Sequence, residues 1–169
     1  MKKLIKTIVF LGSLLLLLTS SSCDNDDIET GDHSFSCYIN GGLFVPKGST
    51  NIVSTSPNND GLSIYLYDDF LSLKVNNSSD FVYFSITNYG IGKINLDNSL
   101  GFFGPSDFHT INHAVVRINN KTYLSKENSG TVTFTAVSDT NVAGTFEFTL
   151  YNENDETDII KVTKGKFND

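Results

Sequence analysis

Two histidines, His109 and His113, are the first side chains in this sequence whose spacing could bind a metal ion. On an α-helix, residues four apart lie on the same face and could share one zinc ion. The neighbouring Phe108 and Ile111 and the preceding Pro105 favour a loop or strand instead. In an extended strand the two histidines would lie roughly 13 Å apart. No glutamate follows His109, so the zinc-protease pattern is missing and we expect no metal site at this pair.

Acidic clusters offer a second kind of metal chemistry. They occur at Asp68 and Asp69 and within residues 152–158. Calcium prefers several oxygen ligands, and acidic hairpin loops can supply them. Neither stretch has the spacing of an EF-hand loop, and solvated turns are the commoner use of these residue types. A calcium site therefore stays a hypothesis, with the second stretch favoured. Its ligands would be Asn152, Asn154, Asp155 and Asp158.

Residue patterns for nucleophilic or phosphate chemistry are missing. No serine lies in a Gly-x-Ser-x-Gly or Ser-x-x-Lys motif, and no glycine-rich loop precedes a helix. Paired carboxylates for glycoside hydrolysis could come from distant strands, but the sequence marks no such pair. Cys37 shares one side of an expected strand with Phe35 and Ile39, which predicts a core residue and not a reactive thiol. We expect no catalytic residue, no cofactor and no enzyme.

An aromatic loop, residues 101–108, is the strongest candidate for ligand contact. It carries Phe102, Phe103 and Phe108 between glycine and proline residues. Clustered aromatic side chains are frequent anchors of binding sites, and they could stack on sugar rings or a protein partner. Alternatively, these rings fold back and cover an open end of the domain. The sequence contains no tryptophan, which weakens the sugar-binding interpretation.

The N-terminus has the pattern of an export signal. Lys2, Lys3 and Lys6 precede an apolar run over residues 8–18, and small residues then lead directly to Cys23. The apolar run is too short to serve as a final span across about 30 Å of hydrocarbon. The segment resembles a bacterial lipoprotein signal, in which the cysteine is lipidated and becomes the new N-terminus. We therefore expect acyl chains on Cys23 to attach the protein to a membrane, and two or more chains hold stably.

Composition restricts the domain count and the partners. Removing residues 1–22 leaves 147 of the 169 residues, which corresponds to one domain. The same cleavage removes three of twelve basic residues and no acidic ones, so the balance becomes 9 − 19 = −10. A protein this acidic is a poor ligand for nucleic acid or anionic lipid. With Cys23 lipidated, Cys37 has no partner for a disulfide.

Period-2 alternation over most of the chain predicts β-strands and no helix. The expected inward positions are Leu62, Ile64, Leu66, Leu71, Leu73, Val75, Val82, Phe84, Ile86, Val132, Phe134, Ala136, Phe146, Phe148 and Leu150. Polar residues, many of them threonine, occupy the alternate positions, which favours antiparallel pairing with one face exposed. We predict an all-β fold, an antiparallel β-sandwich of about eight to ten strands, with a barrel-like closure as the alternative.

Turn residues and tyrosines complete the pattern. Asn-Gly and Asn-Asn pairs, at residues 40–41 and 119–120, predict tight turns between strands. Tyr65, Tyr67 and Tyr83 alternate with the expected core positions. They would form either an outward aromatic face or part of a second buried sheet face.

Four short motifs resemble a known group of proteins. They are FSCYINGGLFVP (residues 35–46), GTVTFT (130–135), GTFEFT (144–149) and VTKGKF (162–167). This series is similar to small uncharacterised envelope lipoproteins of Bacteroidota, which carry a signal ending in cysteine, an acidic tether and one all-β domain. The resemblance implies the cell envelope and a β fold, and it supplies no catalytic residues. Residues 24–27, Asp-Asn-Asp-Asp, are similar to a signal that directs some of these lipoproteins to the cell surface.

The sequence thus divides into three parts: a signal peptide (1–22), a lipidated Cys23 with an acidic tether (23–32), and an all-β domain (33–169). We expect an outer-membrane lipoprotein, surface-exposed if the acidic signal operates. The role most consistent with these sequence patterns is a non-catalytic binding or interaction module, with an unidentified protein or glycan as partner and no nucleic acid. The alternatives are a carbohydrate-binding accessory lipoprotein and, less consistent with the motifs, a hydrolase.

Overall fold

A computed structural model describes residues 34–47, 61–104 and 110–169. Within these residues the fold is all-β, with eleven strands and no helix, against the eight to ten strands expected. No helix of this part of the chain is long and apolar enough to cross a membrane. The strands are β1 (Ser34–Ile39), β2 (Gly42–Phe44), β3 (Leu62–Leu66), β4 (Phe70–Asn77), β5 (Asp80–Thr87), β6 (Gly92–Asn95), β7 (His113–Ile118), β8 (Lys121–Leu124), β9 (Gly130–Val137), β10 (Val142–Asn152) and β11 (Asp155–Asn168).

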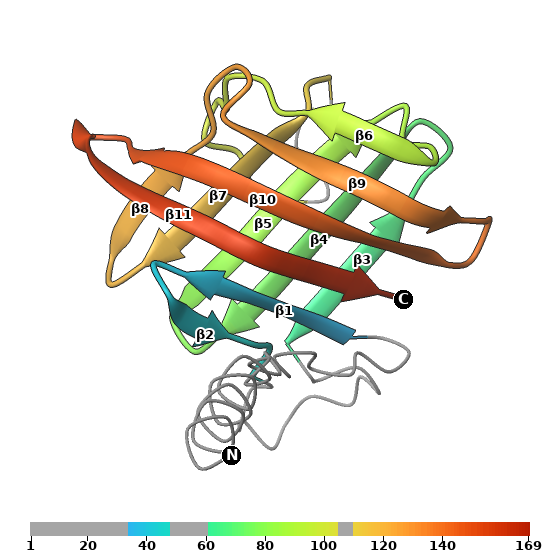
Figure 1. Cartoon of the computed structure of the whole chain (residues 1–169), viewed down its shortest axis with the longest axis horizontal. Helices are drawn as coiled ribbons and strands as arrows, with labels where there is room; N and C mark the ends of the chain where they lie inside the picture. Colours follow the sequence, from blue (N-terminus) through green and yellow to red (C-terminus); the bar gives the residue numbers. More distant parts are fainter. Residues whose placement is uncertain (1–33, 48–60, 105–109) are drawn as a thin grey trace, which may run out of the picture.

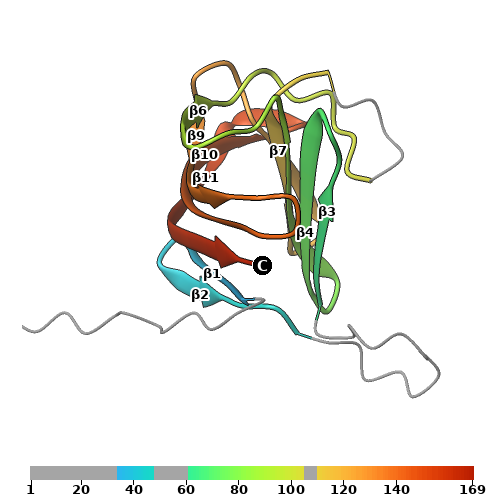
Figure 2. The ribbon, with the colours of Figure 1, turned by 90° about the vertical axis from the view of Figure 1, so that its right-hand side faces the viewer.

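The strands form one antiparallel sheet that folds over on itself. Its hydrogen-bonded order is β2-β1-β11-β10-β8-β7-β5-β4-β3, with β9 and β6 added beside the first part of β10. The last residues of β10, Tyr151 and Asn152, pair with β8, and there the sheet passes from one layer to the other. Figure 2 shows the two layers facing each other, with β1, β2, β6, β9, β10 and β11 on one side and β3, β4 and β7 on the other.

The sheet is not closed into a barrel. Among the described residues, its two end strands, β2 and β3, do not pair with each other. The chain just after β2 nevertheless contacts β4: the backbone N–H of Lys47 donates to the carbonyl of Asn76 at 2.9 Å, and the side-chain amide of Asn77 donates to the carbonyl of Val45 at 3.1 Å. The barrel-like alternative is therefore not supported, and two layers of the open sheet face each other, as a sandwich would require (Figure 1).

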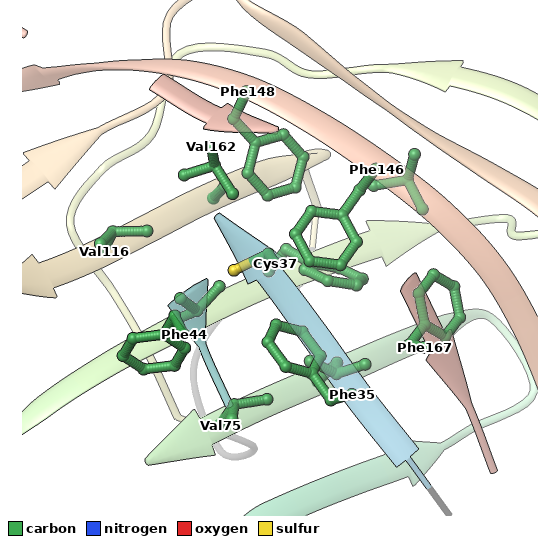
Figure 3. Close-up of a cluster of buried hydrophobic side chains, with 14 of the residues drawn as sticks. Phe35, Cys37, Phe44, Val75, Val116, Phe146, Phe148, Val162 and Phe167 are labelled. Carbon is green, nitrogen blue, oxygen red and sulfur yellow. The ribbon is translucent and has the colours of Figure 1, made fainter. Parts of the chain in front are cut away.

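Aromatic side chains from both layers fill the space between them. Phe146 of β10 lies 5.3 Å, ring centre to ring centre, from Phe84 of β5 in the opposite layer. Phe35, Phe148 and Phe167 surround the same ring (Figure 3). The predicted alternation is confirmed in β10, where Phe146, Phe148 and Leu150 are buried and Glu147 is exposed.

The expected inward position of Ala136 is wrong. Ala136 is exposed, although Val132 and Phe134 of the same strand are buried. The pairing of β9 with β10 shifts between Ala143 and Gly144, which is a β-bulge. A bulge places one extra residue in a strand, so the side chains beyond it point to the opposite faces.

The expectation of one polar, exposed face also fails for β5 and β7. Phe81, Tyr83 and Val115 form a second, smaller hydrophobic cluster on the face opposite the main core, with Leu124 packed against it. Tyr83 is completely buried, whereas Tyr65 and Tyr67 are each 42% exposed. Tyr83 therefore belongs to a second buried face, whereas Tyr65 and Tyr67 are partly exposed.

Tight turns join adjacent strands as their sequences predict. Asn40 and Gly41 both have positive φ between β1 and β2, and Asn119 and Asn120 do so between β7 and β8. Two consecutive residues of positive φ are the signature of the type I′ turn, whose twist matches that of a β-hairpin.

Candidate functional site

Several features predicted from the sequence lie outside the described residues. They are the signal peptide (1–22), the acidic tether with Cys23, the expected lipid attachment site, Phe108 of the aromatic loop, and His109 of the histidine pair. Their roles remain predictions. Among the residues that the structure does describe, no group of three or more His, Cys, Asp or Glu side chains could hold a metal ion.

His113 has a different environment from the metal site considered above. Its ring is 2% exposed, lies 5.7 Å from the Tyr83 ring, and has its Nδ1 2.9 Å from the hydroxyl of Ser99. Ser99 also accepts a hydrogen bond from the Gly101 backbone and donates its own backbone N–H to the carbonyl of Ser125. These contacts hold residues 97–104, which we call the covering loop, to the outer face of β7 and β8.

The two phenylalanines of the covering loop are each partly buried and partly exposed. The Phe103 ring packs on Phe81 of the outer face at 4.8 Å, and the Lys74 ammonium lies about 5 Å from both rings. Phe102 and Phe103 nevertheless remain 45% and 40% exposed. The loop thus covers a face of the sheet and not an open end of the domain, and part of each ring stays accessible to a partner.

The four expected calcium ligands lie in and beside the β10–β11 turn, but the side-chain oxygens of Asn152, Asp155 and Asp158 have protein partners. Asp158 accepts hydrogen bonds from Lys121 at 2.7 Å and from Asn152 at 3.0 Å. The Lys121 ammonium lowers the pKa of Asp158, and the hydrogen bonds from Thr157 lower that of Asp155. The side-chain oxygen of Asn152 accepts a hydrogen bond from the backbone N–H of Asn154. A lysine therefore occupies the position facing Asp158 that a cation would take, and calcium binding stays an untested prediction.

Cys37 lies in the core as the alternation indicates. Its side chain is fully buried between the layers, near Phe35 and Phe44, and it forms no disulfide (Figure 3). Burial raises the pKa of its thiol to about 12. Since the thiolate is the nucleophilic form, this environment makes the side chain a packing group.

One site was not anticipated from the sequence. Three loops meet at one end of the sheet around a cavity of about 440 Å³, which we call the end pocket. The β3–β4 turn contributes Tyr67 and Asp68, the β5–β6 connection contributes Tyr89, and the β9–β10 turn contributes Asp139. The remaining lining residues are Leu66, Val137 and Ser138. Figure 1 shows these turns at the same right-hand end of the molecule.

The end pocket has an apolar inner part and an acidic rim. Leu66, Tyr89 and Val137 also pack against the main core, and the Tyr89 ring lies 5.9 Å from a core phenylalanine. Asp68 and Asp139 are exposed. Pockets that bind small molecules typically measure about 300–1,000 Å³ and combine apolar walls with a few polar groups. The end pocket has that size and includes apolar side chains, although most of its exposed lining is polar.

Backbone hydrogen bonds fix the loops around the pocket. The Tyr67 N–H donates to the carbonyl of Phe70, and the Asn88 N–H donates to that of Asp69, which ties two of the loops together. In the third loop, the Ser138 and Asn141 backbones bond each other at 2.8 Å. The Tyr67 ring is stacked on Phe70 at 4.2 Å. The lining residues are thus held in place before any ligand arrives.

The Tyr89 hydroxyl is influenced by both acidic side chains of the pocket. Its hydroxyl donates to the Tyr67 backbone carbonyl at 3.2 Å. Its pKa is raised, first by burial and then by the negative charges of Asp68 and Asp139. The two aspartates come from turns of opposite layers, and both line the pocket together with Tyr89.

The sequence alone indicates only some of the residues of this site. The Asp68-Asp69 pair and Tyr67 stand out individually, but Asp139 lies in an ordinary Ser-Asp-Thr-Asn turn about 70 residues later. Only the strand order brings these turns together.

Comparison with known proteins finds no match: no protein-family model, no curated protein and no solved structure is similar to this chain. The sequence and the geometry of the end pocket and the covering loop are therefore the basis for a function.

Proposed function

We propose that this protein is a cell-envelope lipoprotein whose β domain is a non-catalytic ligand-binding module, with the end pocket as the binding site. The observation that carries this proposal is the 440 Å³ cavity with its apolar inner part and two exposed carboxylates. Loops supported by a rigid sheet are a frequent location for binding sites. The size of the cavity suits a small molecule or a single group of a larger one.

The membrane attachment in this proposal depends on Cys23. The basic start, the short apolar run and the small residues before this cysteine support lipidation, and the resemblance to Bacteroidota lipoproteins supports the outer membrane. The acidic residues 24–27 support transfer to the cell surface.

Palmitate labelling tests the anchor, since the chain has only two cysteines. In cells expressing the protein, Cys23→Ala should abolish label incorporation and leave the protein out of the membrane fraction. Cys37→Ala serves as the matched control and should retain the label, because this residue is buried in the core. Label that persists in Cys23→Ala would contradict the lipoprotein assignment.

Two features argue for binding without catalysis. The general acid of a glycosidase usually lies in an apolar environment that keeps it protonated, whereas Asp68 and Asp139 are both exposed. Ser99 and His113, a Ser–His pair among the described residues, join the covering loop to the sheet, with the histidine almost completely buried. Incubation with envelope glycans followed by mass spectrometry should yield no cleavage products, and products lost in Asp68→Asn would favour the hydrolase.

The exposed parts of Phe102 and Phe103 favour a second candidate, a carbohydrate-binding accessory lipoprotein acting through the covering loop. Thermal-shift screening with oligosaccharides and envelope metabolites can separate the two sites. A ligand of the end pocket should lose its stabilising effect in Tyr67→Ala and keep it in Tyr65→Ala. This control is closely matched, because both tyrosines are 42% exposed and only Tyr67 lines the cavity. Loss in Phe102→Ala alone would favour the accessory role.

A further inference from the structure

The end pocket has an unbalanced set of hydrogen-bonding groups. Asp68 and Asp139 contribute only acceptors when ionised. The Tyr89 hydroxyl already donates to the Tyr67 carbonyl, and the Ser138 hydroxyl already donates to the Asn141 carbonyl at 3.2 Å. Apart from the Tyr67 hydroxyl, the polar side chains of the rim therefore present acceptors, which a donor-rich ligand would satisfy.

The charge of the pocket also favours a donor-rich ligand, and specifically a positively charged one. Among the described residues, no lysine, arginine or histidine lines the cavity, so neither carboxylate has a cationic partner in its wall. This differs from the β10–β11 turn, where Lys121 lies 2.7 Å from Asp158. A ligand that enters the pocket meets two negative charges that reach it from opposite layers of the sheet.

The shape and the aromatic lining distinguish an organic cation from a metal ion. Two carboxylates are too few to replace the six to eight oxygen ligands of calcium, and no group of three or more metal-binding side chains is present in the described residues. Tyr67 and Tyr89, by contrast, offer ring surfaces, which attract ammonium groups through the cation–π interaction. Leu66 and Val137 can contact the carbon skeleton that carries such a group.

We propose that the end pocket binds a small molecule through a protonated amine, held between Asp68 and Asp139 and against the tyrosine rings. An ammonium group has three donors and no acceptor, which matches the acceptor-rich rim. The amine could belong to an amino sugar or to a simple alkylamine, and both present the same chemistry. This inference names the ligand class of the site proposed above and therefore rests on that proposal.

Isothermal titration of the detergent-solubilised full-length lipoprotein tests this inference. The probes are glucosamine, its neutral relative glucose, and 1,4-diaminobutane, an amine without a sugar ring. Glucosamine should bind and glucose should not, and binding should weaken as salt rises because charges at an open rim are screened. Binding of 1,4-diaminobutane as well would indicate that the amine alone suffices, and binding of glucosamine alone would indicate an amino sugar.

Isosteric variants locate the interaction. Asp68→Asn and Asp139→Asn should each weaken the binding of the amine about two- to fivefold, the range for exposed ion pairs. Asp69→Asn is the matched control, since it removes the same charge from the neighbouring position and does not line the cavity. All three side chains are exposed, so the variants should unfold at the same temperature as the wild type.

Three results would overturn the inference: equal affinity for glucose and glucosamine, no binding of either amine, or equal weakening by Asp69→Asn. The last result would mean that the overall acidity of the protein attracts the amines. A pocket that binds a neutral envelope metabolite while rejecting both amines would leave the proposed binding module in place and refute only the ligand class.

Discussion

Phe146 is the residue on which the packing between the two layers should depend most. It is 2% exposed, and its ring lies 5.0 to 6.4 Å from the rings of Phe148, Phe35, Phe84 and Phe167. Of these, Phe84 belongs to the opposite layer. Phe146→Ala would remove the centre of this aromatic cluster and leave a cavity that its neighbours can fill only in part.

The expected loss is large compared with the stability of a domain. Phe→Ala in a core costs about 3–5 kcal/mol, and aromatic pairs add about 0.5–1.5 kcal/mol beyond burial. Because Phe146 contacts four other rings, we expect the upper part of the first range, about 4–5 kcal/mol. Whole domains are stable by about 5–15 kcal/mol. With a denaturant slope of about 2 kcal/mol per molar urea, the midpoint should fall by about 2 M.

Urea unfolding of the lipid-free domain, residues 33–169, measures this loss. Glu147→Ala is the control, because Glu147 is the next residue of the same strand and points to solvent. It should cost no more than about 0.5 kcal/mol. Equal midpoint shifts for Phe146→Ala and Glu147→Ala would show that the register of β10 is wrong and would refute the two-layer core.

Three other changes test separate parts of the structure. Replacing Phe102 and Phe103 together with serine should cost about 2–3 kcal/mol, since each ring is roughly half buried, and a loss below about 0.5 kcal/mol in urea unfolding would show that the covering loop does not pack on the sheet. Gly165→Ala should destabilise by about 1–3 kcal/mol, because the added carbon would come within 2.5 Å of a core phenylalanine ring, whereas Gly90→Ala, with open space around it, should change the melting temperature little. The Cys37 thiol, whose pKa is raised to about 12, should resist iodoacetamide at pH 8 and react quickly in urea, and equal rates in both conditions would contradict its burial.

Alternation of apolar residues predicts much of this fold because it reports burial directly. It identifies the inward residues of β10 and the buried Cys37 correctly. It fails at Ala136, because a bulge is a local backbone shift that the alternation of residue types does not encode. It also leaves Tyr83 undecided, although the continuous apolar run over residues 81–84 is typical of a strand buried on both faces.

The end pocket could not be predicted in the same way, because its parts are remote in sequence. Asp68 and Asp139 belong to turns of opposite layers, and each alone looks like a solvated turn residue. The expected calcium ligands show the opposite situation, in which residues that are close in sequence have a further partner that is remote in sequence. Asn152 and Asp158 are close in sequence and in space, but Lys121, from the β7–β8 hairpin, also donates a hydrogen bond to Asp158. Composition alone could not reveal this third partner.

Mapping of amide chemical shifts tests the central claim, that the end pocket is the binding site of this protein, most directly. The isotope-labelled lipoprotein would be titrated with the small-molecule fraction of an envelope extract and followed by two-dimensional NMR. The account predicts shifts that concentrate at Tyr67, Asp68, Tyr89 and Asp139, and that disappear in Tyr67→Ala. Shifts confined to the covering loop, or no shifts at saturating extract, would contradict it.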